Sequence, residues 1–297
     1  MRQRYVAALI TGFLPWLALN AQSAPSPDVF LVGIRMDGGV PTLTGVVKNV
    51  TARAGYDNQP SWSRDGSSIY YTSTREDAQA DIYRYELASG TVTRVTQTAP
   101  ESEYSATLTP DGKALSVIRV ERDSTQRLWR FPLDGSAPSV ILPGLKPAGY
   151  QAWASDRMMA VFVLGSPNAL VLGDIVSQHV DTVARRVGRS LHRVPGSSHI
   201  SYPQFEQDSV VAVMELEPAT KGLTRRAELP RGVEDYAWTP NGRLIAGDGS
   251  RLVWWNGTAW TPIGDLGSHG LRQITRLAVS PRAKWIAVVA IPTAENR

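Results

Sequence analysis

The stretch PSWSRDGSSIYYTS, residues 60–73, predicts two short strands joined by a tight turn. The first strand ends at Trp62. The turn is supplied by Asp65-Gly66, because glycine adopts positive φ angles without steric cost and aspartate caps the turn with its side chain. A second apolar run, which begins at Ile69, then returns beside the first. The unit is a β-hairpin, and it cannot bury both of its faces alone.

Weaker copies of this hairpin recur along the chain. They read LTPDGKALSV at 108–117, WTPNGRLIA at 238–246, VSPRAKWIAV at 279–288 and, in degenerate form, WASDRMMAV at 153–161. A third and a fourth strand are expected after the first two hairpins, at 81–87 and 92–96, and at 126–133 and 139–142. Four antiparallel strands that recur every ~40 to 46 residues are typical of a propeller blade.

The number of blades follows from where the units begin. Complete units start near Tyr56, Ser102, Ala148, Ser190 and Glu234. The Ser190 unit lacks the Asp-Gly turn, and its expected strands are 191–194, 199–205, 209–215 and 223–229. A final half-unit, 272–291, has two strands, and the N-terminal region supplies the other two at 29–35 and 42–49.

We therefore predict an all-β fold over 25–297, a six-bladed β-propeller of four-stranded antiparallel blades. Its last blade is shared between the N- and C-terminal strands, which closes the ring and removes free sheet edges there. The alternative is a two-domain β protein. In that case, however, the two terminal half-units would have no reason to complement each other.

The N-terminus predicts export. Arg2 and Arg4 precede an apolar run from Val6 to Leu19, which is short for a membrane span. Small residues follow, with expected cleavage after Ala21 or Ala24. We interpret residues 1–24 as a secretory signal peptide and expect a periplasmic or secreted protein. A buried first helix and an uncleaved anchor are the alternatives. No later segment is long and apolar enough to predict a transmembrane helix.

Composition narrows the function classes. The chain has no cysteine, which excludes disulfides and thiolate chemistry. Its formal net charge is +4, and loss of Arg2 and Arg4 with the signal leaves 29 basic against 27 acidic residues. The basic residues are scattered, so we expect no nucleic-acid partner. We also expect a monomer.

The pattern Trp-Ser-x-Asp-Gly-x-x-Ile-x-Tyr-x-Ser of residues 62–73 resembles the WD40-like (PD40) repeat of TolB propellers. Residues 57–88 carry the resemblance best. It implies a TolB-like six-bladed propeller. The repeat tryptophans are expected to pack between blades; they are Trp62, Trp153, Trp238 and Trp285.

No catalytic residue is predicted. The sequence has no Gly-x-Ser-x-Gly elbow, and its four histidines do not have the spacing of a helical metal site. The Asp-Gly turns resemble fragments of calcium loops, but the acidic run that completes such a loop is missing. We expect no cofactor, with a channel calcium ion as the alternative.

Alignment of the blades on their turns places polar and aromatic residues at the start of each innermost strand, around one mouth of the central channel. The predicted ligand-binding residues are Asp57, Asn58, Glu103, Tyr104, Tyr150, Gln151, Glu234, Asp235, Tyr236 and Arg276. This acidic and aromatic rim suits a cationic peptide segment, a sugar, or a metal held by Asp57, Glu103 and Glu234. A solvated rim without a ligand is the plainer interpretation.

The leading functional hypothesis is a binding module that docks a protein, a peptide or an envelope polymer at this mouth. The alternative is a propeller enzyme, a lactonase, lyase or hydrolase, with a metal in the channel. A scaffold subunit of a larger exported complex is a third possibility. Fold alone does not choose among the three.

Overall fold

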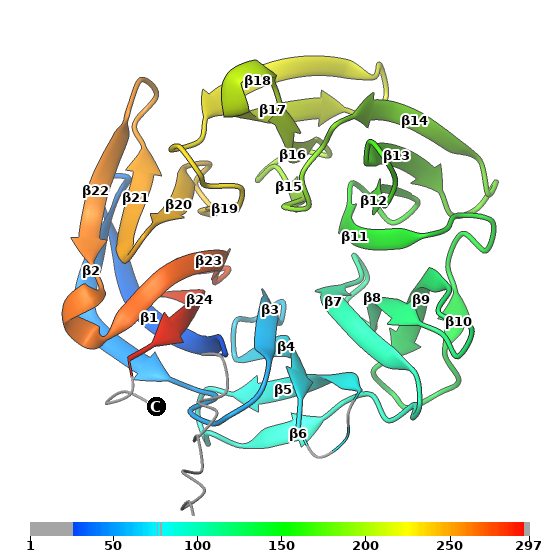
Figure 1. Ribbon diagram of the computed structural model, residues 1–297, viewed down its shortest axis with the longest axis horizontal. Coiled ribbons are helices and arrows are strands. Elements are labelled where there is room, and N and C mark those ends of the chain that lie inside the picture. The colour runs from blue at the N-terminus through cyan, green and yellow to red at the C-terminus, as the bar shows by residue number, and fades with distance from the viewer. Residues whose placement is uncertain (1–25, 76, 78, 294–297) are drawn as a thin grey trace, which may run out of the picture.

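The computed structural model describes residues 26–75, 77 and 79–293. In Figure 1 they form six four-stranded antiparallel sheets around a central axis. The predicted signal peptide lies outside the described residues. Within the described part of the chain, two single turns of 3₁₀ helix, Gln207–Ser209 and Gly267–His269, are the helical elements. No helix there has the length and hydropathy of a membrane span.

The first three blades follow one another along the chain. Blade 1 contains β3 (Asp57–Trp62), β4 (Ser68–Thr74), β5 (Ala80–Glu86) and β6 (Val92–Arg94). Blade 2 contains β7 (Ser102–Leu108), β8 (Ala114–Val120), β9 (Gln126–Pro132) and β10 (Ser139–Val140). Blade 3 contains β11 (Ala148–Trp153), β12 (Met158–Val163), β13 (Ala169–Asp174) and β14 (Val180–Arg185).

The other three blades complete the ring. Blade 4 contains β15 (His192–Arg193), β16 (Ile200–Phe205), β17 (Val211–Glu217) and β18 (Gly222–Glu228). Blade 5 contains β19 (Tyr236–Trp238), β20 (Leu244–Asp248), β21 (Arg251–Trp255) and β22 (Trp260–Asp265). Blade 6 contains β23 (Leu271–Val279), β24 (Trp285–Pro292), β1 (Asp28–Asp37) and β2 (Val40–Asn49).

The predicted six-bladed propeller with a shared last blade is confirmed. The sixth sheet has the strand order β2-β1-β24-β23, so the two chain ends meet in its middle. β1 and β24 pair antiparallel, from Asp28 opposite Ala290 to Gly33 opposite Trp285. The fourth blade forms without an Asp-Gly turn, because Gly196 at φ 75° supplies the bend between β15 and β16.

Each apolar cluster lies between two neighbouring blades. Successive side chains of a strand point to opposite faces, so a central strand serves two clusters at once. In β1, Val29 and Leu31 pack against blade 1, whereas Phe30 and Val32 pack against blade 5. This explains why β1 reads as a nearly continuous apolar run instead of an alternating one.

Three of the repeat tryptophans connect their own blades, 1, 3 and 5, to the preceding blade. Their indole Nε1–H groups donate to Ala278 O from Trp62 (2.8 Å), to Ser116 Oγ from Trp153 (2.9 Å) and to Ser201 Oγ from Trp238 (2.8 Å). Trp285 packs between blades 6 and 1. The tryptophans therefore fix the spacing of the inner strands.

The contribution of the pairing between β1 and β24 to stability can be tested by creating a cavity beside it. Ile286 is fully buried and pairs with Val32 across that joint. We expect Ile286→Ala to lower the free energy of unfolding by about 2 to 5 kcal/mol. Leu223→Ala, at a position 47% exposed on an outer strand, is the control and should change it by less than about 0.5 kcal/mol. If Ile286→Ala and Leu223→Ala changed the free energy of unfolding in urea equally, the pairing of β1 with β24 would not be a special source of stability.

Candidate functional site

The inner strands of all six blades surround a central channel with two chambers. The larger chamber, about 470 Å³ in volume, lies near the hairpin turns and is lined by residues from all six blades. The smaller one, about 200 Å³, lies where the inner strands begin and is lined by residues such as Tyr56, Asn58 and Thr275. Tyr150, Arg189 and Arg276 line both chambers and therefore mark the boundary between them.

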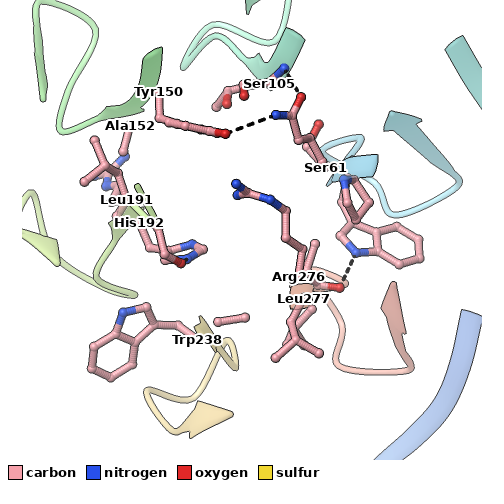
Figure 2. A pocket seen from close by; sticks show the side chains of 18 of the residues that line it. Ser61, Ser105, Tyr150, Ala152, Leu191, His192, Trp238, Arg276 and Leu277 are labelled. Atoms are coloured by element: carbon pink, nitrogen blue, oxygen red, sulfur yellow. Dashed lines mark hydrogen bonds between the residues drawn. The ribbon is translucent and has the colours of Figure 1, made fainter. Parts of the chain in front are cut away.

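Arg276 extends into the middle of the channel from β23. Figure 2 shows its guanidinium between Tyr150 and Ser61, directed away from the strand. The guanidinium carbon lies 4.8 Å from the centre of the Tyr150 ring, and Nη1 lies 3.5 Å from Asp235 Oδ1. The aromatic face and the carboxylate hold the cation in place, although the contact with Asp235 is longer than a hydrogen bond.

Arg189 is the second cation of the boundary. It precedes β15 and is exposed. Partial desolvation of the guanidinium by the channel wall acts to lower the pKa of Arg189. The neighbouring Tyr150, Asp235 and Glu234 act in the opposite direction, and the net pKa is raised. The side chain therefore keeps its charge throughout the physiological pH range.

Gln59 connects three blades along the channel wall. Its Oε1 accepts hydrogen bonds from Ser105 N and Thr72 Oγ1, both at 2.8 Å, and its Nε2 donates to Tyr150 OH at 3.4 Å. Gln59 and Ser105 have positive φ angles, 56° and 55°, at shifts of strand register in β3 and β7. Such bulges re-aim side chains and are common beside functional sites.

Several buried polar atoms of the larger chamber have no hydrogen-bond partner among the described residues. They are Ser61 Oγ, Ser105 Oγ, Gln151 Oε1 and Asp235 Oδ1. A buried polar atom without a partner costs about 1 to 3 kcal/mol. A polar ligand that supplies these hydrogen bonds recovers part of that cost, so the wall is suited to a ligand with both donors and acceptors.

His192 and Ser190 form a pair on the same wall. His192 Nε2 lies 2.9 Å from Ser190 Oγ, and burial lowers the pKa of His192 to about 4. The imidazole is therefore neutral near pH 7. Ser190 Oγ also accepts the Tyr236 N–H at 3.3 Å and is 4% exposed. The serine therefore joins two blades and is poorly placed to attack a ligand.

Six of the ten predicted binding residues line the channel. Asn58 lines the smaller chamber, Gln151, Asp235 and Tyr236 line the larger one, and Tyr150 and Arg276 line both. Glu234 is exposed and lines neither chamber, and Tyr104 packs into the apolar cluster between blades 2 and 3.

The remaining two, Asp57 and Glu103, are fully buried inside their blades and line neither chamber. Arg53 Nη2 lies 2.9 Å from Asp57 Oδ1, and Arg119 Nε lies 3.3 Å from Glu103 Oε1. These two carboxyl groups are enclosed beside their arginine partners inside the blades, so they do not make the mouth acidic. Among the described residues, no three Asp, Glu or His side chains gather as a metal site, and Asp57, Glu103 and Glu234 do not form one.

Sequence reasoning missed Gln59, Ser61, Ser105, Arg189 and His192. Gln59 and Ser105 stand three residues before Trp62 and Leu108, the equivalent ends of two inner strands, so the repeat register contained a signal for them. Arg189 and His192 belong to the blade without an Asp-Gly turn, where no such register exists.

The sequence and the structure were compared with those of known proteins. The family model described as the TolB beta propeller domain matches residues 40–185. No curated protein matches the sequence. A protein of Agrobacterium tumefaciens described as a TolB is similar in structure, with a TM-score of 0.68, 15% identity, and coverage of 91% of this chain and 100% of that one.

Two further structures share the fold. TolB from Acinetobacter baumannii has a TM-score of 0.56 and 13% identity, over 89% of this chain and 63% of its own. A gluconolactonase from Xanthomonas campestris has a TM-score of 0.65 and 10% identity, over 88% of this chain and 95% of its own. At these identities the likeness concerns the fold.

The buried carboxyl of Glu103 predicts a pH dependence. Burial raises the pKa of Glu103 to about 7 from its ordinary 4.5, although the hydrogen bond from Thr98 and the charge of Arg119 act to lower it. The folded protein thus holds this proton more tightly than the unfolded chain. The Glu103 contribution to stability is therefore present below pH 4.5 and is lost as the pH rises to about 7.

We expect Glu103→Gln to remove this slope in urea unfolding measured across that pH interval, whatever constant offset the substitution adds. Glu228→Gln, at an exposed position, serves as the control and should keep the wild-type slope. Parallel curves for the wild type and Glu103→Gln would show that the Glu103 carboxyl does not titrate in this range.

Proposed function

We propose that this chain, a TolB-like six-bladed β-propeller, is an exported binding protein that takes up a peptide segment of a partner in its central channel. The observation that carries the proposal is the set of buried polar atoms without partners on the wall of the larger chamber, Ser61 Oγ, Ser105 Oγ and Gln151 Oε1. A volume of about 470 Å³ lies within the usual range of ligand sites.

A peptide suits this wall chemically. An extended backbone presents N–H donors and C=O acceptors in regular alternation, and these groups need hydrogen-bond partners once they are removed from water. The Gln151 carbonyl oxygen accepts N–H groups, and the two serine hydroxyls both donate and accept. The three groups come from β3, β7 and β11, so one inserted segment contacts three blades.

The competing function is a propeller enzyme with a channel metal. The fold shared with a gluconolactonase is the observation behind it, and it concerns the scaffold alone. Elemental analysis of purified protein separates the two functions. A stoichiometric divalent cation would favour the enzyme and count against the binding protein.

The proposal that the protein is exported rests on the predicted signal peptide, residues 1–24. Expressed in a bacterial host, the protein is expected in the periplasmic fraction, with a new N-terminus at Gln22 or Pro25 as determined by N-terminal sequencing. Recovery of cytoplasmic protein that still begins at Met1 would argue against export.

Channel binding is tested with a random dodecapeptide library displayed on phage, panned against the purified protein. Thr107 lines the larger chamber, so Thr107→Trp fills part of it. Selected peptides should bind this variant about tenfold more weakly or worse, which corresponds to about 1.4 kcal/mol. Thr93→Trp, on the exposed outer strand β6, is the matched control and should bind like the wild type. Equal binding to all three proteins would refute uptake in the channel.

A further inference from the structure

We infer that the segment taken up in the channel carries a carboxylate, which the guanidinium groups of Arg189 and Arg276 bind where the two chambers meet. The inference rests on the proposed function and adds the chemistry of the ligand. It also reverses the sign of the charge in one of the three ligands that the sequence left open at an acidic rim, a cationic peptide segment, a sugar or a metal.

The charges that face the channel are mainly positive. The smaller chamber is lined by Arg189 and Arg276 and by no acidic residue among those described. The larger chamber adds Arg193 and one carboxylate, Asp235. Charges of one sign that line a concave site attract a ligand of the opposite sign more strongly than they do on an open surface.

Arg276 has hydrogen-bond donors to spare. A guanidinium carries five N–H donors. Among the described residues, its polar contact is the ion pair with Asp235 at 3.5 Å, and no hydrogen bond to the guanidinium is present. The guanidinium carbon lies 4.8 Å from the centre of the Tyr150 ring, a contact that leaves the N–H donors available to an acceptor.

A carboxylate is the acceptor that matches this arrangement. Guanidinium and carboxylate pair through two parallel N–H···O bonds, which gives geometric selectivity as well as energy. Gln151 Oε1 and Ser105 Oγ, both buried and without partners, lie in the same larger chamber. These groups suit the amide N–H groups of a residue beside the carboxylate. The combination suits an acidic peptide, whose amide N–H groups stand at regular positions beside the carboxylate, and comparison with an acidic saccharide tests this choice.

Substitution of Asp235 distinguishes the inference from a structural role of this residue, because the two predict opposite changes in ligand binding. It is the carboxylate already nearest Arg276, and its Oδ1 has no hydrogen bond. A ligand carboxylate must therefore compete with Asp235 for the same cation. Removal of the Asp235 charge should strengthen ligand binding, whereas a purely structural role of this residue would weaken it.

The experiment is isothermal titration calorimetry of the full protein with triglutamate, with triglutamine as the uncharged counterpart. We expect triglutamate to bind at least about tenfold more tightly than triglutamine. Arg276→Gln and Arg189→Gln should each weaken triglutamate binding about tenfold, and Asp235→Asn should strengthen it by a factor of about three or more. Arg157→Gln, an exposed arginine paired with Asp174 on blade 3, is the control and should change nothing.

Each other outcome has a definite meaning. Equal binding of triglutamate and triglutamine, or weaker binding by Asp235→Asn with its fold intact by circular dichroism, would overturn the inference. Trigalacturonate that binds through both arginines while triglutamate does not would also overturn it, in favour of an acidic saccharide. If the phage library yields channel-dependent peptides without acidic residues, the inference fails and the proposed function stands. If it yields no channel-dependent peptide, the proposed function itself fails.

Discussion

The antiparallel pairing of β1 with β24 is the interaction on which the rest of the structure depends. Each blade buries its two faces against its neighbours, so an open row of blades would leave two apolar faces and two sheet edges in water. The pairing of β1 with β24, from Asp28 to Gly33, joins the two ends of the chain by hydrogen bonds and so covers these faces and edges. The channel and its chambers exist only inside the ring that this pairing closes.

Closure also explains why the candidate site is composite. The hydrogen bond between Gln59 and Tyr150 joins residues 91 positions apart, and the one between Trp62 and Ala278 spans 216 positions. No single blade contains the site. Its geometry depends on how the blades are spaced, and that spacing is set by the indole groups that bind the preceding blade.

The repeat made the architecture predictable from sequence, whereas the chemistry of the channel was less so. The pattern of Trp62, Asp65 and Gly66 recurs, complete or in part, in most blades because they are built on similar hairpins, and a recurrent pattern reveals a fold. Asp57 and Glu103 were placed correctly along their strands. Both side chains, however, are buried inside their blades beside Arg53 and Arg119, which lie outside the repeat motif. Gln59 and Ser105 take left-handed conformations without being glycine, so local propensity gives no warning of those bulges.

The boundary formed by Tyr150, Arg189 and Arg276 gives the molecule two unequal sides. The larger and smaller chambers share these three side chains in their walls, so they are adjoining parts of one channel. If the proposed segments entered from either face, they would reach the same two arginines, Arg189 and Arg276, which line both chambers. On the proposed function, binding at one face would therefore compete directly with binding at the other, without any change in the shape of the ring.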